Sequence, residues 1–228
     1  MQEFLTKVFP NVMSKLPDFY ESIYETIIMV GWSGSISFII GLLLGIMLTV
    51  TKKGGILQNL VLFQMLDKTI NFLRSIPFII LLASLIPLTR LISGTAIGID
   101  GAIVPLVFGT VPFFSRQIES ALAEMDSGLI EAAQSMGSGP IDIIFRAYLK
   151  ECIPGIVRGT TITAISLIGL SAMAGAVGAG GLGDFAIRFG YQRNQIDVTY
   201  ASVIVLVGMV SIIQIIGNFI VQKNSHIH

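Results

Sequence analysis

The feature that most constrains this chain is an uninterrupted apolar run near its beginning. Ile27–Val50 contains 24 residues without a single Asp, Glu, Lys or Arg. An α-helix of about 20 apolar residues is long enough to cross the hydrocarbon of a bilayer. The run is also longer than the apolar part of a cleavable signal peptide. It therefore predicts a membrane-spanning helix.

The composition extends this interpretation to the whole chain. Of its 228 residues, 53% are hydrophobic and 12% are charged, whereas soluble domains contain about 25% charged residues. The formal net charge is zero. The basic excess typical of nucleic-acid binding is missing, and we expect no nucleic-acid partner. Cys152 is the only cysteine, and His226 and His228 stand within the last three residues. We therefore expect neither a disulfide nor a metal site.

Apolar segments recur along the sequence and predict an all-α integral membrane protein with five transmembrane helices in one domain, residues 1–228. The second predicted helix is continuous over 60–89. The third continues past Arg116, although Pro105 and Pro112 interrupt its apolar part. The predicted spans are 27–50, 60–89, 101–118, 153–177 and 198–221, with one long polar loop at 119–151.

The basic residues indicate how such a bundle is oriented. Five spans place the two ends of the chain on opposite sides of the membrane. With the N-terminus outside, the cytoplasmic segments hold nine of the 14 Lys and Arg residues, and the outside segments hold five. Because cytoplasmic loops are enriched in Lys and Arg, we expect the N-terminus outside and both the C-terminus and the 119–151 loop in the cytoplasm.

Residues 126–150 have the pattern of two short amphipathic helices. Asp126 or Ser127 can cap the first helix, and Gly137 is a natural stop. Pro140 suits the first turn of the second helix. Such helices either lie on the bilayer surface or dock against a partner, and small residues that allow close approach favour docking. The apolar residues at helical spacing are Leu129, Ala132, Ala133 and Met136 in the first helix, and Ile141, Ile144, Phe145 and Tyr148 in the second.

The same loop resembles a known motif. Glu131-Ala132-Ala133 followed by Gly137 resembles the EAA loop of binding-protein-dependent ABC importer permeases, and Pro154 is similar to the proline that opens the next span in that family. Residues 147–150 read Ala-Tyr-Leu-Lys, where the family often has Ile-x-Leu-Pro. The resemblance implies a coupling helix that inserts into a cleft of a cytoplasmic ATPase. The residues that it assigns to this coupling are Glu131, Ala132, Ala133, Met136, Gly137, Pro140 and Pro154.

Three further segments are similar to the methionine importer permeases of that family. They are residues 72–82 (FLRSIPFIILL), 101–106 (GAIVPL) and the glycine-rich 171–183 (SAMAGAVGAGGLG). The resemblance implies a type I importer permease that imports methionine as a homodimer, because one chain carries half of a pathway. It also implies a cytoplasmic ABC ATPase dimer, an extracytoplasmic solute-binding protein, surrounding membrane lipid and a location in the bacterial cytoplasmic membrane.

This chain is not expected to be an enzyme. Its sequence contains no G-x-x-x-x-G-K-[ST] loop that could cradle ATP phosphates. ATP and Mg are therefore expected on the partner ATPase, and no cofactor is expected on this chain. Gly178–Gly183 fits the G-x-G-x-x-G template of dinucleotide sites, but it closes an apolar span instead of following a strand. We interpret these glycines as allowing close helix approach or local unwinding.

Seven residues are candidates for the transport pathway or its gate. Arg74 lies near the inner end of the second predicted span, where a charge indicates function, although its side chain can instead extend to the interface. Ser171 and Met173 can line a path for a small solute, although core packing also explains them. The full set is Arg74, Pro77, Ser171, Met173, Gly178, Gly180 and Gly181.

Other functions are also compatible with these residues. A permease of the same superfamily can carry another amino acid or a small solute, and competition of uptake would separate these solutes. An ion-coupled secondary carrier acting alone would need paired ionisable residues at the bilayer midplane. The first and fifth predicted spans have none. A structural membrane scaffold is a third alternative that no feature specifically supports.

Overall fold

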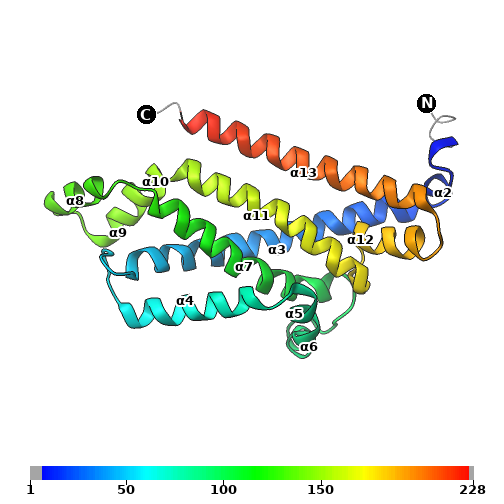
Figure 1. Ribbon diagram of the computed structural model, residues 1–228, viewed down its shortest axis with the longest axis horizontal. Coiled ribbons are helices and arrows are strands. Elements are labelled where there is room, and N and C mark those ends of the chain that lie inside the picture. The colour runs from blue at the N-terminus through cyan, green and yellow to red at the C-terminus, as the bar shows by residue number, and fades with distance from the viewer. Residues whose placement is uncertain (1–6, 226–228) are drawn as a thin grey trace. The chain divides into compact units, whose positions relative to one another are not determined.

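The computed structural model describes residues 7–225, and within this range every regular element is a helix (Figure 1). His226 and His228 lie outside the described residues. The α-helices are α2 (Pro10–Met13), α3 (Leu16–Thr51), α4 (Leu60–Ser75), α5 (Phe78–Ser84), α6 (Ile86–Ser93), α7 (Gly98–Ala123), α8 (Ser127–Ser135), α9 (Pro140–Asp142), α10 (Leu149–Glu151), α11 (Ile153–Ala174), α12 (Gly181–Phe185) and α13 (Ile196–Ser225). The π-helical segments η1 (Ile143–Tyr148), η2 (Gly175–Ala179) and η3 (Ala186–Tyr191) follow α9, α11 and α12.

Four of the described helices are long and apolar enough to cross a membrane. They are Leu16–Thr51, Gly98–Ala123, Ile153–Ala179 and Ile196–Asn224. These segments contain four of the five predicted spans, and the all-α membrane class is confirmed. The count of five spans stays a prediction.

The second predicted span is not one helix. Ile76 has an extended backbone, with φ of −83° and ψ of 123°, because the ring of the following Pro77 disfavours the helical conformation in the residue before it. A second break at Leu85 separates α5 from α6. The continuous helix expected over 60–89 is therefore wrong, and α4, α5 and α6 occupy this segment instead.

The two prolines of the third predicted span do not interrupt its helix. α7 runs through Pro105 and Pro112 to Ala123, and both prolines are buried. Packing against neighbouring elements compensates for the hydrogen bond that a proline removes from a membrane helix. The expected continuation of the helix past Arg116 is confirmed.

The described chain forms two compact units. Unit 1 comprises the chain up to Ser35 together with Pro77–Phe108 and Ala164–Ile213, and unit 2 comprises Ile36–Ile76, Gly109–Thr163 and the chain from Gln214. The long helices α3, α7, α11 and α13 each contribute one segment to either unit. The single domain expected from the sequence stays a prediction.

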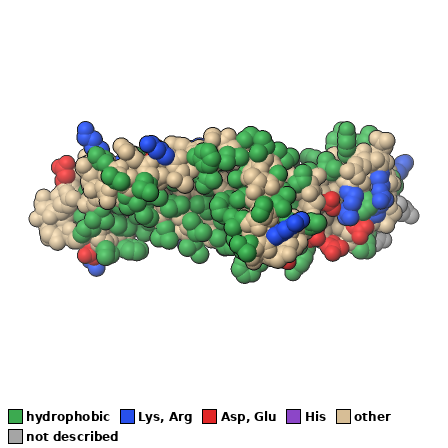
Figure 2. All heavy atoms as spheres, turned by 90° about the horizontal axis from the view of Figure 1, so that it is seen from below, with side chains coloured by type: hydrophobic (Ala, Val, Ile, Leu, Met, Phe, Trp, Pro, Cys, Tyr) green, Lys and Arg blue, Asp and Glu red, His purple; other side chains and the backbone are tan. Residues whose placement is uncertain are grey.

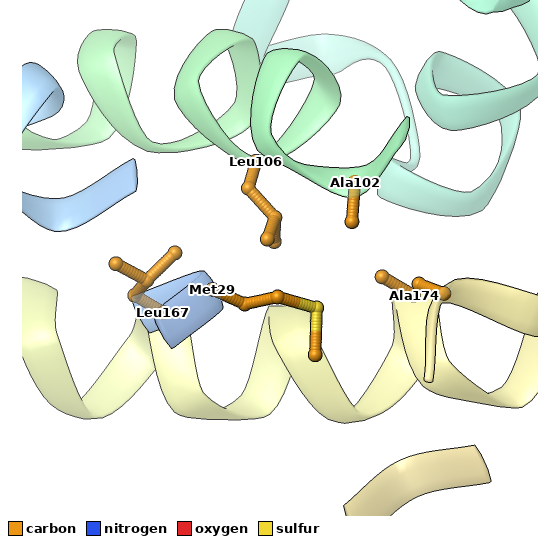
Figure 3. Packing of buried hydrophobic residues seen from close by; sticks show 6 residues of the cluster. Met29, Ala102, Leu106, Leu167 and Ala174 are labelled. Carbon is orange, nitrogen blue, oxygen red and sulfur yellow. The ribbon is translucent and has the colours of Figure 1, made fainter. Parts of the chain in front are cut away.

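The core of unit 1 joins three long helices around one methionine. Met29 of α3, Leu106 of α7 and Leu167 of α11 are each at most 1% exposed. Figure 3 shows Leu106 and Ala102 pointing from α7 toward Leu167 and Ala174 of α11, with Met29 between them. The small alanine side chains let these helices approach closely.

The core of unit 2 anchors the polar loop to α7. Phe114, Ile118 and Leu122 recur at every fourth residue of α7, and all three are buried. They pack in one cluster with Ile143 and Tyr148 of η1. The apolar face that forms the core of unit 2 therefore also holds the loop.

Candidate functional site

The polar loop begins with a helix whose two ends follow from local chemistry. The Asp126 carboxylate accepts a hydrogen bond from the Gly128 N–H at 2.8 Å and caps α8. At the other end Gly137 has a φ of +80°, in the left-handed region that favours glycine. The Ser138 N–H donates to the Ala133 carbonyl at 3.0 Å and closes the helix. The predicted stop at Gly137 is confirmed, and the first of the two predicted caps is the one used.

The apolar face predicted for α8 is mostly exposed. Leu129 is 49% exposed and Met136 is 79% exposed, and Ala132 is exposed as well. The half-buried Ile130 and Ala133 instead pack against the core of unit 2. Because apolar residues stand on more than one side of this short helix, periodicity alone does not determine which side faces the core.

The second helical segment of the loop is a π-helix at its centre. Pro140 occupies the first turn of α9, as predicted. In η1, Ile143 and Tyr148 are five residues apart and both buried, because the i to i+5 bonding of a π-helix brings such residues onto one side. Ile141 and Phe145 are 71% and 66% exposed. The regular α-helix expected over this segment is therefore wrong at its centre, and the apolar face expected from it divides between the buried Tyr148 and the exposed Ile141 and Phe145.

Together the two segments expose a patch that we call the loop surface: Leu129, Met136, Ile141 and Phe145. α8 packs against η1, and the segment lies at one end of unit 2 (Figure 1). Glu131, also on α8, is exposed. Several large apolar side chains exposed together mark a contact with a protein or a membrane. Glu131 adds a carboxylate that can pair with a basic group of a partner.

A cavity of about 310 Å³ lies beside the loop, with Glu124, Pro154 and Arg158 in its wall. Pro154 stands near the beginning of α11, where the sequence placed the opening of the next span. Burial raises the pKa of the Cys152 thiol, and the carboxylates of Glu124 and Glu151 raise it further. This thiol is therefore protonated at neutral pH and is a poor nucleophile and a poor metal ligand.

Arg74 and Pro77 lie at the junction of α4 and α5. Arg74 is in the last turn of α4 with an exposed side chain. No residue between 7 and 225 forms a hydrogen bond or ion pair with its guanidinium. Pro77 marks the break before α5. The structure therefore gives Arg74 no partner that would define a gate.

Arg116 is an enclosed charge of unit 2, with a side chain that is 18% exposed. Its guanidinium donates to the Glu119 carboxylate at 2.6 Å and to the side-chain oxygen of Asn71 at 3.0 Å. It also pairs with Asp67 of α4. This network ties α4 to α7 within unit 2. Sequence reasoning missed it, although an arginine followed three residues later by a glutamate in a helix was a visible signal.

The glycine-rich segment turns the chain after α11. Gly180 has a φ of 83° and a ψ of −164°, a conformation essentially limited to glycine. The Glu25 carboxylate of α3 accepts a hydrogen bond from the Gly181 N–H at 2.6 Å. Beside it, the Thr26 hydroxyl oxygen accepts one from the Leu182 N–H at 2.9 Å. Two side chains of α3 thus hold the beginning of α12.

The other pathway candidates do not meet at one place in unit 1. Ser171 is 1% exposed, and its hydroxyl donates to the Ile168 carbonyl at 2.8 Å. Met173 is 53% exposed, and Gly178 is exposed in the turn with a positive φ. Ser171 is therefore satisfied within its own helix and shares no surface with Met173. The pathway role of all these candidates stays a prediction.

Comparison with known proteins identifies the family. Residues 27–225 match the family described as the inner membrane component of binding-protein-dependent transport systems. The chain belongs to this family. The match covers the loop and all five predicted spans, and the resemblance drawn from the EAA-like loop and the glycine-rich segment is confirmed.

Relatives of this inner membrane component are similar over most of their length. The probable D-methionine transport system permease protein MetI of Vibrio cholerae is 47% identical over 203 residues, which cover 89% of this chain and 90% of the relative. The methionine import system permease protein MetP of Bacillus subtilis is 44% identical over 214 residues, 94% of this chain and 96% of the relative. Both relatives are named as transport permeases, not as enzymes.

Solved structures agree with this family membership. A chain of the inward-facing MetNI methionine ABC transporter is 44% identical, with a TM-score of 0.90 over 92% of this chain and 98% of that one. An amino acid ABC transporter with histidines is 16% identical, with a TM-score of 0.76 over 94% of this chain and 98% of that one. The second match supports the fold alone.

Two features of this inner membrane component were outside the reach of sequence reasoning. They are the Arg116 network with Asp67 and the Glu25 hydrogen bond to the glycine turn. Each joins segments far apart along the chain, and no local pattern indicates such a pairing. The available signal at Glu25 was its position as the last carboxylate before the charge-free run.

Proposed function

We propose that this chain is the permease subunit of an ABC importer for methionine. The observation that carries the proposal is 44 to 47% identity, over about nine tenths of the chain or more, with permeases named for methionine transport. The TM-score of 0.90 with a chain of the MetNI methionine ABC transporter supports it. The chain moves the solute and hydrolyses no ATP. ATP and Mg act on a partner ATPase.

The loop surface is where the ATPase docks. Met136, Ile141 and Phe145 are exposed apolar anchors, and burying such a side chain contributes about 1.5–3 kcal/mol. The small exposed Ala132 lets a partner backbone approach α8 closely, and Glu131 supplies a charge to pair. The residues proposed to couple the two proteins are Glu131, Ala132, Ala133, Met136, Gly137, Pro140 and Pro154.

A movement of the loop reaches a spanning helix through the core of unit 2. Ile130 and Ala133 on the inner side of α8 pack on the cluster that contains Tyr148 of η1 and Phe114 of α7. Close-packed side chains transmit a displacement because they have no free volume to absorb it. When ATP closes the ATPase pair, the loops of the two permeases are pulled toward each other. This movement shifts the bundle from the inward-facing to the outward-facing packing.

The proposed function also implies how the transporter is assembled. Two copies of this chain form a homodimer in the bacterial cytoplasmic membrane, with the N-terminus outside and the loop surface in the cytoplasm. An extracytoplasmic solute-binding protein delivers methionine to the outer side. The glycine turn held by Glu25 follows the end of α11, and we assign it to the outer part of the pathway.

Reconstitution tests this function directly. Proteoliposomes that contain this chain, its ATPase and its binding protein are expected to accumulate labelled methionine only when ATP reaches the ATPase side. Uptake of the same label without ATPase, driven by a proton or sodium gradient, would establish an ion-coupled carrier instead. Competition by unlabelled amino acids identifies the solute, and a competitor stronger than methionine would overturn the methionine assignment.

A further inference from the structure

An apolar pocket lies at the beginning of α3 and α13, within unit 1. Its volume is about 420 Å³, and its nine lining residues are all apolar or tyrosine. Phe9 and Phe19 contribute to its lining from the N-terminal part of the chain, and Ile204 and Val205 contribute from α13. The α13 residues belong to a segment apolar enough to span a membrane, of which only 6% is buried in the protein. This pocket therefore opens where lipid chains lie.

Three basic side chains gather at the polar end of the same helices. The charged groups of Arg188, Arg193 and Lys15 lie 4.6, 4.8 and 5.6 Å from the centre of the Phe189 ring. Figure 2 shows basic and acidic side chains close together at the end where α2 and α12 lie. A ring stabilises a nearby cation, but three like charges around one ring repel one another.

The carboxylates of this region leave part of that charge unbalanced. Asp184 pairs with Arg188 at 3.2 Å. Asp197 accepts hydrogen bonds from the backbone and side-chain nitrogens of Asn11, both at 2.9 Å. Between residues 7 and 225, no carboxylate forms an ion pair with Arg193 or with Lys15, whose Nζ donates instead to the neutral Gln195 Oε1 at 3.0 Å. An anion placed among these groups would relieve their repulsion.

The pocket and the basic group belong to one structural cluster. Phe189, Val12 and Ala201 are buried together, with Phe9 and Phe19 packed against them, and four of these five residues also line the pocket. Lys15 precedes α3 and Arg193 precedes α13, so the charges stand at the beginnings of the two helices whose side chains line the pocket. The order from charge to apolar pocket matches a molecule with an anionic head and a hydrocarbon tail.

We propose that this site binds one anionic phospholipid. Its phosphate lies between Lys15 and Arg193, and one acyl chain enters the pocket against Ile204. An acidic protein surface would satisfy the cations but would not fill an apolar pocket beside a lipid-exposed helix. The proposal does not depend on which solute is transported.

Lipid retention tests the proposal. The full chain is incorporated into nanodiscs of equal phosphatidylglycerol and phosphatidylcholine, and native mass spectrometry measures the lipid that stays bound. The wild-type chain is expected to retain phosphatidylglycerol preferentially. The double variant Lys15→Gln/Arg193→Gln is expected to lose about fivefold in this preference for each charge removed. The matched control is Arg90→Gln, which replaces an exposed arginine of α6 in the same unit. This variant is expected to keep the wild-type preference for phosphatidylglycerol.

A second variant tests the tail independently of charge. Ile204 is 60% exposed, so Ile204→Trp adds bulk to the pocket without disturbing a buried core. It is expected to reduce retention of both lipids while the helical circular dichroism stays unchanged. Wild-type retention in either variant overturns the proposal. Dissociation of the homodimer by Ile204→Trp also overturns it, because the pocket would then bind the second copy of this chain. A loss of binding-protein affinity in the charge variant, with lipid retention intact, overturns it too, because the basic group would then bind that protein.

Discussion

Single residues at the glycine turn show how a conformation and a charge act together. Gly180 has backbone angles that an L side chain rarely adopts, and a Cβ placed there would lie 2.7 Å from the Glu25 carboxylate oxygen. The same carboxylate accepts the Gly181 N–H. The turn therefore depends on a missing side chain at one position and on a carboxylate supplied from α3.

Replacing Gly180 with alanine is expected to destabilise the chain by about 1–3 kcal/mol, from backbone strain alone. Displacement of Glu25 from its hydrogen bond adds to this loss. The measurement is the midpoint of thermal unfolding of the purified chain in detergent. Gly169→Ala is the matched control, because Gly169 is helical and a Cβ there meets nothing within 4 Å. An equal midpoint for the two variants would contradict the role given to this turn.

The raised pKa of Cys152 has a consequence for its reactivity. Iodoacetamide reacts with the thiolate, so alkylation of Cys152 is expected to be slow at neutral pH and to increase about tenfold per pH unit beyond pH 8.5. An exposed thiol, introduced as Ser135→Cys in a Cys152→Ser background, is expected to level off near that pH. Mass spectrometry of the labelled chain gives both rates. If the alkylation rates of the two thiols depended on pH in the same way, burial and the neighbouring carboxylates would not raise the pKa of Cys152.

At the scale of elements, local chemistry determined where helices end, and packing determined which way they face. Asp126, Gly137 and Pro140 act where the sequence predicted, because a cap, a left-handed glycine and an N-terminal proline are properties of a few adjacent residues. The side of η1 that is buried follows from its π-helical form, which brings Ile143 and Tyr148 together. Both residues pack in one cluster with side chains of α7, and the π-helical form is absent from the periodicity.

The loop surface can be tested by adding charge to it. Ile141→Asp and Phe145→Asp are each expected to weaken ATPase binding by about 2 kcal/mol, which is roughly 30-fold, because a carboxylate would be buried without a partner. Co-purification with the ATPase and ATP-dependent uptake measure the effect. Ile97→Asp is the matched control, since Ile97 is 74% exposed and Ile141 is 71% exposed. Normal ATPase binding by both loop variants would assign the loop surface to the bilayer.

At the scale of the whole molecule, the long helices α3, α7, α11 and α13 each supply segments to two compact units. Within unit 2, the Arg116 network joins α4 to α7 and accounts for most of the enclosed charge described there. Such pairings are set only when distant segments meet. They could not be derived from the spacing of residues along the chain.

Orientation is a property of the whole molecule that labelling can establish. In a Cys152→Ser background, a cysteine introduced as Ser14→Cys is expected to react with a membrane-impermeant maleimide added to intact spheroplasts. Ser135→Cys, on α8, is expected to react only after the membrane is permeabilised. Both parent serines are exposed in the structure. The opposite pattern would place the N-terminus in the cytoplasm and would remove the loop surface from the side of the ATPase.

The amino-acid sequence by itself determined that this chain is a helical membrane protein, where most spans lie, and which loop resembles a docking motif. These properties depend on the length of apolar runs and on a few adjacent residues, which local chemistry controls. Only the tertiary structure decided that α7 continues through Pro105 and Pro112, which residues of α8 and η1 face outward, and that Glu25 holds the glycine turn. These outcomes depend on contacts between distant segments, whose free energy is gained only when the helices pack together.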